Sequence, residues 1–248
     1  MDILGIDIGG SGIKGAFVNV KKGKLSSERV RIPTPQPALP DAINDKIGKL
    51  VKNHKYDGPI GVGFPAIIQD GVVRSAANVA EEWIGYPGAK VMSKTTGCQV
   101  TLLNDADAAG IAEMRFGAGK KKRGVVIVLT LGTGIGSSLF ADGKLVPNTE
   151  LGHLFLRNSK ADAEDYASDR IRAAERLTWK NWAVRLDEYI HHLEFIFSPT
   201  LIILGGGVSK RYDKFIPHLT VKTRVVPAQL RNEAGIVGAA IAAVENIR

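Results

Sequence analysis

The sequence predicts an α/β protein of two lobes built on one plan. Two segments about 120 residues apart share one layout, in which an apolar strand enters a glycine-rich turn, leaves as a second strand and reaches Gly-Lys-Leu. The first copy spans residues 4–25 and the second spans residues 125–145. Alternating helix and strand patterns follow each copy, so we expect two lobes with an internal repeat and a central cleft.

The elements after each copy are predicted from hydrophobic periodicity. Residues 41–54 carry apolar side chains at helical spacing, and residues 59–63 have the pattern of a short buried strand. Further strands are expected at residues 100–103 and 201–204. Residues 178–197 place their apolar side chains along one helical face, which we assign to core packing.

The last predicted helix starts at about residue 232. It carries Gly235, Gly238, Ala239 and Ala242 at helical spacing, which allows close approach to a neighbouring element. We assign residues 1–103 and about 232–248 to a small N-terminal lobe, and residues 104–231 to a larger C-terminal lobe.

Composition restricts the class of protein. A chain of 248 residues with 44% hydrophobic content can bury a substantial core. Cys98 is the only cysteine, which excludes an intrachain disulfide, favours a reducing compartment and makes Cys98 itself a candidate small buried hydrophobe. Met1 leads directly into a strand pattern, and no apolar run approaches the roughly 18 residues that span a bilayer. We therefore expect a cytoplasmic protein without a membrane partner.

The net charge of +8 favours an anionic partner. The densest basic run, residues 120–123, lies between two apolar segments and has the pattern of a solvated turn. A nucleic-acid binder would gather its charge with stacking aromatic side chains, but aromatics are only 6% of this chain and lie in apolar patterns. We expect no nucleic-acid partner.

The first glycine turn matches GxGxxG through Gly10, Gly12 and Gly15, a pattern found in dinucleotide-binding folds. Those folds need a helix after the glycines, whereas residues 16–20 alternate like a strand, so the turn joins two strands of a hairpin. Glycine and serine leave backbone N–H groups open to phosphate oxygens. The candidate phosphate-binding residues of the two turns are Gly9, Gly10, Ser11 and Gly12, and Thr130, Gly132, Thr133 and Gly134. For either turn alone, a simple tight hairpin is the alternative.

Two charged residues flank the first turn. Asp7 ends the first strand, where its carboxylate could position a phosphate-bound Mg²⁺ directly or through water. Lys14 lies across the hairpin and could neutralise phosphate charge. The alternative for Lys14 is an ordinary surface lysine.

The segment LNDADAAG, residues 103–110, places Asn104 and Asp105 after a strand and before a helical pattern. Phosphoryl transfer to an alcohol needs a carboxylate that accepts the hydroxyl proton, and Asp105 is the candidate catalytic base. Its alternative role is the N-cap of the helix, for which Asp107 is an equal candidate.

Five motifs in this order resemble the ROK family of sugar kinases and related repressors. They are DIGGSGIKG at residues 7–15, LNDADAAG at 103–110, LTLGTGIG at 129–136, TELGH at 149–153 and LGGGVS at 204–209, so the likeness extends over nearly the whole chain. The resemblance implies an actin-like ATPase fold, also described as ribonuclease H-like. It also implies a Mg²⁺-dependent phosphotransferase and a homodimer.

The resemblance also implies roles for individual residues. Asp105 matches the catalytic base of the family. The positions that match sugar-binding residues are Asn78, Asn104, Asp105, Glu150, His153 and, as a weaker candidate, Glu164. Gly205, Gly206 and Gly207 match the turn beside the nucleotide.

The chain departs from the family pattern at two places. Many members carry a zinc-binding CxCGxxGC after the sugar-binding histidine, but residues 155–165 contain no cysteine, so we expect no structural zinc. Repressor members place a helix-turn-helix before the first glycine turn, and only a few residues precede Asp7 here. This departure disfavours DNA binding.

Within the family, the chain resembles bacterial polyphosphate-dependent glucokinases and glucomannokinases. The shared features are GGSGIKG, TPQPA at residues 34–38, RSAANV followed by Trp83, and VPNTELGHL at residues 146–154. The resemblance implies glucose or mannose as acceptor and polyphosphate or ATP as donor. The basic candidates for a polyphosphate path are Lys14, residues 120–123, Lys210 and Arg211. The alternatives are an ATP-only kinase for another hexose or an N-acetylhexosamine, and a non-catalytic sugar sensor.

Overall fold

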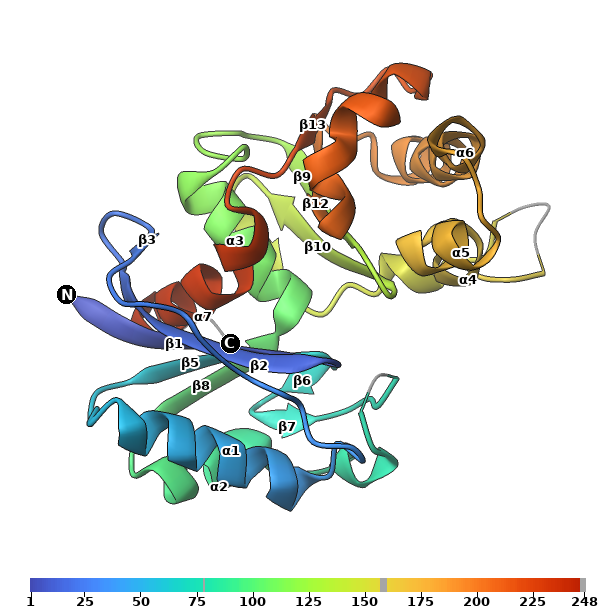
Figure 1. Ribbon diagram of the computed structural model, residues 1–248. Coiled ribbons are helices and arrows are strands. Elements are labelled where there is room, and N and C mark those ends of the chain that lie inside the picture. Colours follow the sequence, from blue (N-terminus) through green and yellow to red (C-terminus); the bar gives the residue numbers. More distant parts are fainter. Residues whose placement is uncertain (78, 157–159, 246–248) are drawn as a thin grey trace. The chain divides into compact units, whose positions relative to one another are not determined.

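The computed structural model describes residues 1–77, 79–156 and 160–245, and the chain divides into two units (Figure 1). The first unit contains Met1–Ala112 and Glu233–Arg248, and the second contains the residues between them. The first boundary differs from the one predicted after residue 103. The structure places it after Ala112 because the start of the following helix packs in the first unit, where a Cβ on Gly238 would collide with the backbone carbonyl of Ala108.

The first unit is built on a sheet in the order β3-β2-β1-β5-β8, with β4 also pairing with β2. Strands β1 and β2 form an antiparallel hairpin around the first glycine turn, while β1, β5 and β8 are parallel. The strands are β1 (Asp2–Gly9), β2 (Gly12–Asn19), β3 (Lys24–Leu25), β4 (Val30–Ile32), β5 (Ile60–Phe64) and β8 (Val100–Asn104). A separate small hairpin joins β6 (Ile68–Gln69) and β7 (Val72–Val73).

Helices cover both faces of this sheet. Figure 1 shows α1 (Pro40–Asn53) and α2 (Gly88–Thr96) on one face and α7 (Ala234–Glu245) on the other. A Cβ on Gly5 of β1 or on Gly61 of β5 would collide with backbone carbonyls of α7, so only glycine permits this close packing. The close approach predicted for the last helix is confirmed. A 3-10 turn, η1 (Glu81–Trp83), inserts Trp83 into the core against Phe64, with ring centroids 4.5 Å apart.

Cys98 is buried at the end of this core, and burial raises the pKa of its thiol. Its predicted role as a small buried hydrophobe is confirmed. In the part of the chain that the structure describes, none of the helices combines the length and apolar character needed to cross a membrane.

The second unit repeats the plan of the first. Its sheet has the order β11-β10-β9-β12-β13, in which β9 and β10 form the hairpin around the second glycine turn and β12 runs parallel to β9. The strands are β9 (Val125–Leu131), β10 (Ile135–Ala141), β11 (Lys144–Val146), β12 (Leu201–Gly206) and β13 (Val225–Pro227). A hairpin beside a parallel strand therefore occurs in both units, which confirms the internal repeat.

Helix α6 (Trp179–Phe197) supplies the core of the second unit. It begins where Thr178 Oγ1 accepts a 3.2 Å hydrogen bond from the N–H of Asn181. Its buried stripe packs with Ile127 and Ile202 of the sheet, as predicted. The other elements are α4 (Ala163–Ala167), α5 (Asp169–Ala174) and the 3-10 segments η2 (Leu151–His153), η3 (Gly207–Lys214), η4 (Ile216–His218) and η5 (Arg231–Glu233).

Candidate active site

The first glycine turn is held by three side chains of its own unit. Arg31 donates to the carbonyl of Ser11 at 2.9 Å, and Thr34 donates to the carbonyl of Gly9 at 2.6 Å. Gln36 reaches the carbonyl of Gly10 at 3.3 Å. Because these side chains engage the carbonyls, the turn has a fixed shape before any ligand arrives. The sequence indicated the turn itself but not these three supports.

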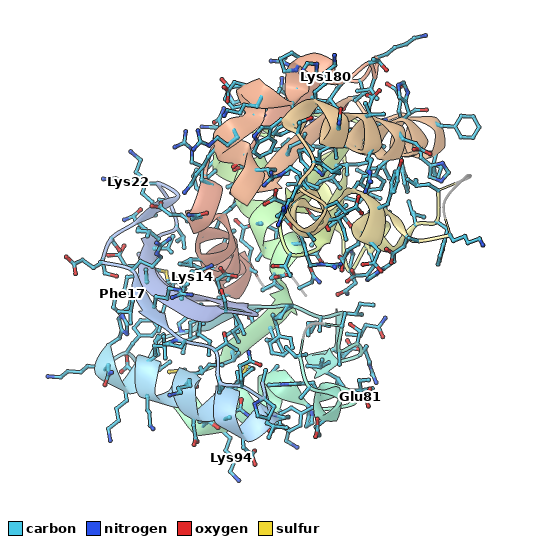
Figure 2. All side chains as sticks on the ribbon, turned by 45° about the vertical axis from the view of Figure 1, so that its right-hand side comes forward. Lys14, Phe17, Lys22, Glu81, Lys94 and Lys180 are labelled. Carbon is cyan, nitrogen blue, oxygen red and sulfur yellow. The ribbon has the colours of Figure 1, made fainter. Side chains whose placement is uncertain are left out.

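Asp7 and Lys14 are direct partners in the β1–β2 pairing. Lys14 Nζ lies 2.9 Å from Asp7 Oδ2, with side-chain exposures of 29% and 15%. Figure 2 labels Lys14 on its strand. Lys14 is therefore an ion-pair partner of Asp7 in this structure, and its role in neutralising phosphate charge stays a prediction.

Metal ligands are sparse around Asp7. Within residues 1–77, 79–156 and 160–245, no group of three or more His, Cys, Asp or Glu side chains could hold a metal ion. Mg²⁺ is commonly bound by one or two carboxylates together with substrate phosphates and water. The single carboxylate of Asp7 beside the glycine turn fits that mode of binding.

Asn104 ends β8 and caps α3 (Asp105–Phe116). Its Oδ1 accepts hydrogen bonds from the N–H groups of Ala106 at 2.8 Å and Asp107 at 3.1 Å, and its Nδ2 donates to the carbonyl of Ala66 at 3.2 Å. The N-cap role that we considered for Asp105 and Asp107 therefore belongs to Asn104. Asp105 is the first residue of the helix and is partly exposed, whereas Asp107 is buried.

The second glycine turn is held by residues of α4 and α5. The N–H of Ile135 donates to Glu164 Oε2 at 2.8 Å. Arg170 contacts the turn twice, since its Nε donates to the carbonyl of Thr133 at 3.0 Å and its backbone N–H donates to that of Gly132 at 3.1 Å. Glu164, a candidate sugar ligand, is thus attached to a candidate phosphate turn. The role of Arg170 was not indicated by any sequence pattern.

The third glycine turn lies beside the second in the same unit. Gly205 pairs with Thr130 and Gly206 pairs with Leu131, because β9 and β12 are parallel neighbours that end at the same edge. Gly206 has φ 78° and ψ −169°, a conformation essentially restricted to glycine. The turns at residues 132–134 and 205–207 therefore form one glycine-rich edge.

His153 is oriented by a residue that the sequence did not single out. Its Nδ1 lies 2.8 Å from Asp162 Oδ2, while Asp162 Oδ1 caps α4 by accepting from the N–H of Asp165 at 2.8 Å. The hydrogen bond to Asp162 raises the pKa of His153 although partial burial opposes this, and the charges of Glu164 and Glu150 add to the rise. Burial acts to raise the pKa of Asp162, but the hydrogen bonds from His153 and Asp165 bring it below its usual value.

Glu150 completes an acidic cluster in the second unit. Burial raises the pKa of its carboxyl, and the charge of Glu164 adds to the rise while His153 opposes it. His153 thus interacts electrostatically with Glu150, Asp162 and Glu164, and Glu164 also acts on Glu150. Such groups can accept and donate hydrogen bonds to several hydroxyls of one polyol. Asn78, predicted to bind sugar, lies outside the described residues.

The predicted site residues fall into two sets. The first unit contains Asp7, Gly9, Gly10, Ser11, Gly12, Lys14, Asn104 and Asp105. The second unit contains Thr130, Gly132, Thr133, Gly134, Glu150, His153, Glu164, Gly205, Gly206 and Gly207. Each unit therefore combines a glycine turn with polar side chains suited to an alcohol or a phosphate.

Comparison with known proteins gives consistent matches along the chain. The ROK family pattern matches residues 3–170. The chain is 46% identical over 242 residues to a polyphosphate glucokinase of Mycobacterium tuberculosis, which covers 97% of this chain and 91% of the relative.

Solved structures match the fold as closely. The inorganic polyphosphate/ATP-glucomannokinase of Arthrobacter sp. strain KM is 50% identical, with a TM-score of 0.94 and 99% of both chains covered. A ROK family glucokinase from Streptomyces griseus, solved in complex with glucose and AMPPNP, is 26% identical, with a TM-score of 0.84 over 99% of this chain and all of the other.

Proposed function

Because the chain belongs to the ROK family and has its actin-like ATPase fold, we propose that it is a polyphosphate/ATP-dependent glucokinase. The reaction transfers the terminal phosphoryl group of the donor to the 6-hydroxyl of glucose. The resemblance to a glucomannokinase also supports mannose as a second acceptor.

One observation supports the pairing of sugar and phosphate chemistry most directly. Glu164 accepts from the N–H of Ile135 at the second glycine turn, and its charge also contributes to the raised pKa values of Glu150 and His153. One side chain, Glu164, thus links the carboxylate cluster proposed to bind sugar hydroxyls to the turn proposed to bind phosphate oxygens. A non-catalytic sugar sensor would not need that connection.

In the proposed mechanism, Asp105 accepts the proton of the 6-hydroxyl as the hydroxyl oxygen attacks the terminal phosphorus. Its place at the start of α3 leaves it partly exposed, so it can reach a bound substrate. Asn104, Glu150 and His153 orient the sugar, with Asn78 and Glu164 as further contacts. The glycine turns bind phosphate oxygens through backbone N–H groups.

Mg²⁺ would be held near Asp7, directly or through water, and would neutralise charge on the donor phosphates. The ion pair with Lys14 keeps the Asp7 carboxylate beside the turn. The absence of a structural zinc, a cytoplasmic location and a homodimer stay predictions.

The test is a grid of sugars against donors with the purified protein. Glucose and mannose should give their 6-phosphates with both polyphosphate and ATP, measured by coupled assay and by mass. N-acetylglucosamine and N-acetylmannosamine should react poorly. A protein that phosphorylates an N-acetylhexosamine best, or that uses ATP alone, would instead be one of the alternative kinases. A protein that binds glucose without forming any sugar phosphate would be a sensor.

A further inference from the structure

A pocket of about 410 Å³ lies within the second unit, outside the acidic cluster around Glu150 and His153. Leu201 of β12 and Val226 of β13 line it with apolar surface, and three exposed basic side chains, Lys122, Arg224 and Arg231, also line it. None of its lining residues that the structure describes is acidic. The pocket is therefore a concentration of positive charge.

Across the described ranges of the chain, the side chains of Lys122, Arg224 and Arg231 form neither a hydrogen bond nor an ion pair. Other arginines of the same unit do pair: the ion pairs are Arg170–Asp165, Arg172–Asp169 and Arg185–Glu175. Three like charges around one pocket repel one another, and a bound polyanion would remove that repulsion.

Buried Glu113 fixes the loops that carry two of these cations. Its Oε2 accepts from the N–H of Ala118 at 2.9 Å, and its Oε1 accepts from the N–H of Leu230 at 2.7 Å. Ala118 lines the pocket, and Leu230 precedes Arg231. Because both oxygens bind backbone N–H groups, the carboxylate holds the pocket's edges in place without pairing with its cations.

The pocket adjoins the third glycine turn. Two of its lining residues contact that turn: Ser209 Oγ donates to the carbonyl of Gly206 at 2.8 Å, and the Cβ of Ala228 lies 3.5 Å from where a Cβ on Gly205 would stand. A donor bound at Gly205–Gly207 can therefore continue into the pocket without crossing to another part of the unit.

We propose that this pocket binds the phosphate chain of a polyphosphate donor behind its terminal group, through Lys122, Arg224 and Arg231. The proposal rests on the proposed function. Polyphosphate carries about one negative charge per phosphate along its whole length, so each cation meets an oxyanion. ATP ends in a nucleoside after three phosphates and would gain little from cations beyond them. The pocket thereby favours polyphosphate over ATP.

The test compares two double variants of equal charge change. Lys122→Gln with Arg224→Gln removes two pocket cations, and Lys94→Gln with Lys180→Gln removes two exposed lysines elsewhere, both labelled in Figure 2. An exposed ion pair contributes up to about fivefold in affinity, so the pocket variant should lose up to about 25-fold in kcat/KM for long-chain polyphosphate. Its kcat/KM for ATP should stay within about twofold, and the control should keep both.

Arg224→Lys, which retains the charge, should keep most of the polyphosphate activity. If kcat/KM falls equally with both donors, the pocket either binds the nucleotide or supports the fold. If the polyphosphate kinetics are unchanged, the pocket does not bind the donor. Either result overturns the proposal. If the wild-type protein is active with ATP alone, the proposal is overturned, but the protein is still a glucokinase. If no donor gives glucose 6-phosphate, the proposed function fails, and calorimetric binding of polyphosphate to wild type and pocket variant decides the inference separately.

Discussion

His153 Nδ1 lies 2.8 Å from Asp162 Oδ2. The pair joins a candidate sugar ligand to the N-cap residue of α4. The two pKa values move apart, that of the histidine upward and that of the carboxyl downward. A pair of this kind has a defined pH range in which both partners are charged.

Asp162→Asn tests that pair, because asparagine retains an oxygen that can cap α4 but loses the charge. We expect the pKa of His153 to fall toward its ordinary value of 6.5, since its hydrogen bond to Asp162 is the main cause of the rise. An NMR titration of the His153 ring measures it. Asp169→Asn, which removes a carboxylate from α5 instead, should leave that titration unchanged; if both variants shift it equally, the assigned cause is wrong.

The same variant has a predicted effect on stability. His153 binds its proton more tightly when folded, so its contribution is complete below pH 6.5 and is lost as pH rises through the raised pKa. Asp162 contributes above its ordinary 3.8 and loses this as pH falls through the lowered pKa. The difference in unfolding free energy between wild type and Asp162→Asn should therefore be largest between pH 3.8 and pH 6.5, and should decline outside that range. Urea unfolding at a series of pH values measures it, and a difference that does not change with pH would contradict it.

Glu150→Gln should stabilise the protein and weaken its binding of glucose. The raised pKa means that ionising Glu150 costs the folded protein free energy, and this cost begins as pH rises above the ordinary 4.5 and is complete above the raised pKa. The variant, which stays neutral, should therefore gain stability relative to wild type as pH rises from 4.5 through the raised pKa. Loss of a charged hydrogen-bond partner should weaken glucose binding by about 10- to 100-fold. Thermal unfolding and calorimetric glucose titration measure the two effects, and a variant that loses stability relative to wild type as pH rises above 4.5 would refute the first.

Asp105→Asn should reduce kcat by about 10² to 10⁴-fold with little change in glucose affinity, because the amide cannot accept the hydroxyl proton. Asp41→Asn, a matched change in the exposed first turn of α1, should leave kcat near the wild-type value. Steady-state rates and glucose titrations of both variants provide the comparison. Near-normal turnover of Asp105→Asn would remove it as the base.

Gly206→Ala should destabilise the protein by about 1–3 kcal/mol, because its backbone conformation excludes other residues and a Cβ would collide with Leu131. Gly207→Ala is the control, since a Cβ there meets nothing within 4 Å. Denaturant unfolding gives both free energies. Equal values would mean that the strained turn relaxes without cost.

The fold was predictable because its signals are local. Alternating apolar strands broken by glycine marked both hairpins, and helical periodicity marked α1 and α6 to within one residue at either end. Small residues spaced along the last helix indicated the close contact that Gly238 makes with Ala108. These patterns depend on neighbours along the chain, which sequence displays directly.

The supports of the site were not predictable in the same way. In LNDADAAG the sequence pattern offered Asp105 and Asp107 as caps of the helix, and only the position of the Asn104 side chain at the end of β8 shows that Asn104 caps it instead. The sequence pattern at Asp162 is that of an ordinary helix start, and only the structure shows that its side chain pairs with His153. Lys122 and Arg224 are about 100 residues apart in the sequence, and only the folded sheet brings them to one pocket. The boundary after Ala112 likewise depends on tertiary packing.

The close fit of α7 onto β1 and β5 has a consequence for protein synthesis. Residues 234–245 leave the ribosome after the entire second unit, yet they cover a face of the first sheet. Until then the part of that face that α7 covers stays exposed on the nascent chain, and the second unit has everything it needs to fold earlier. The half of the protein that is translated first is thus the half that is completed last.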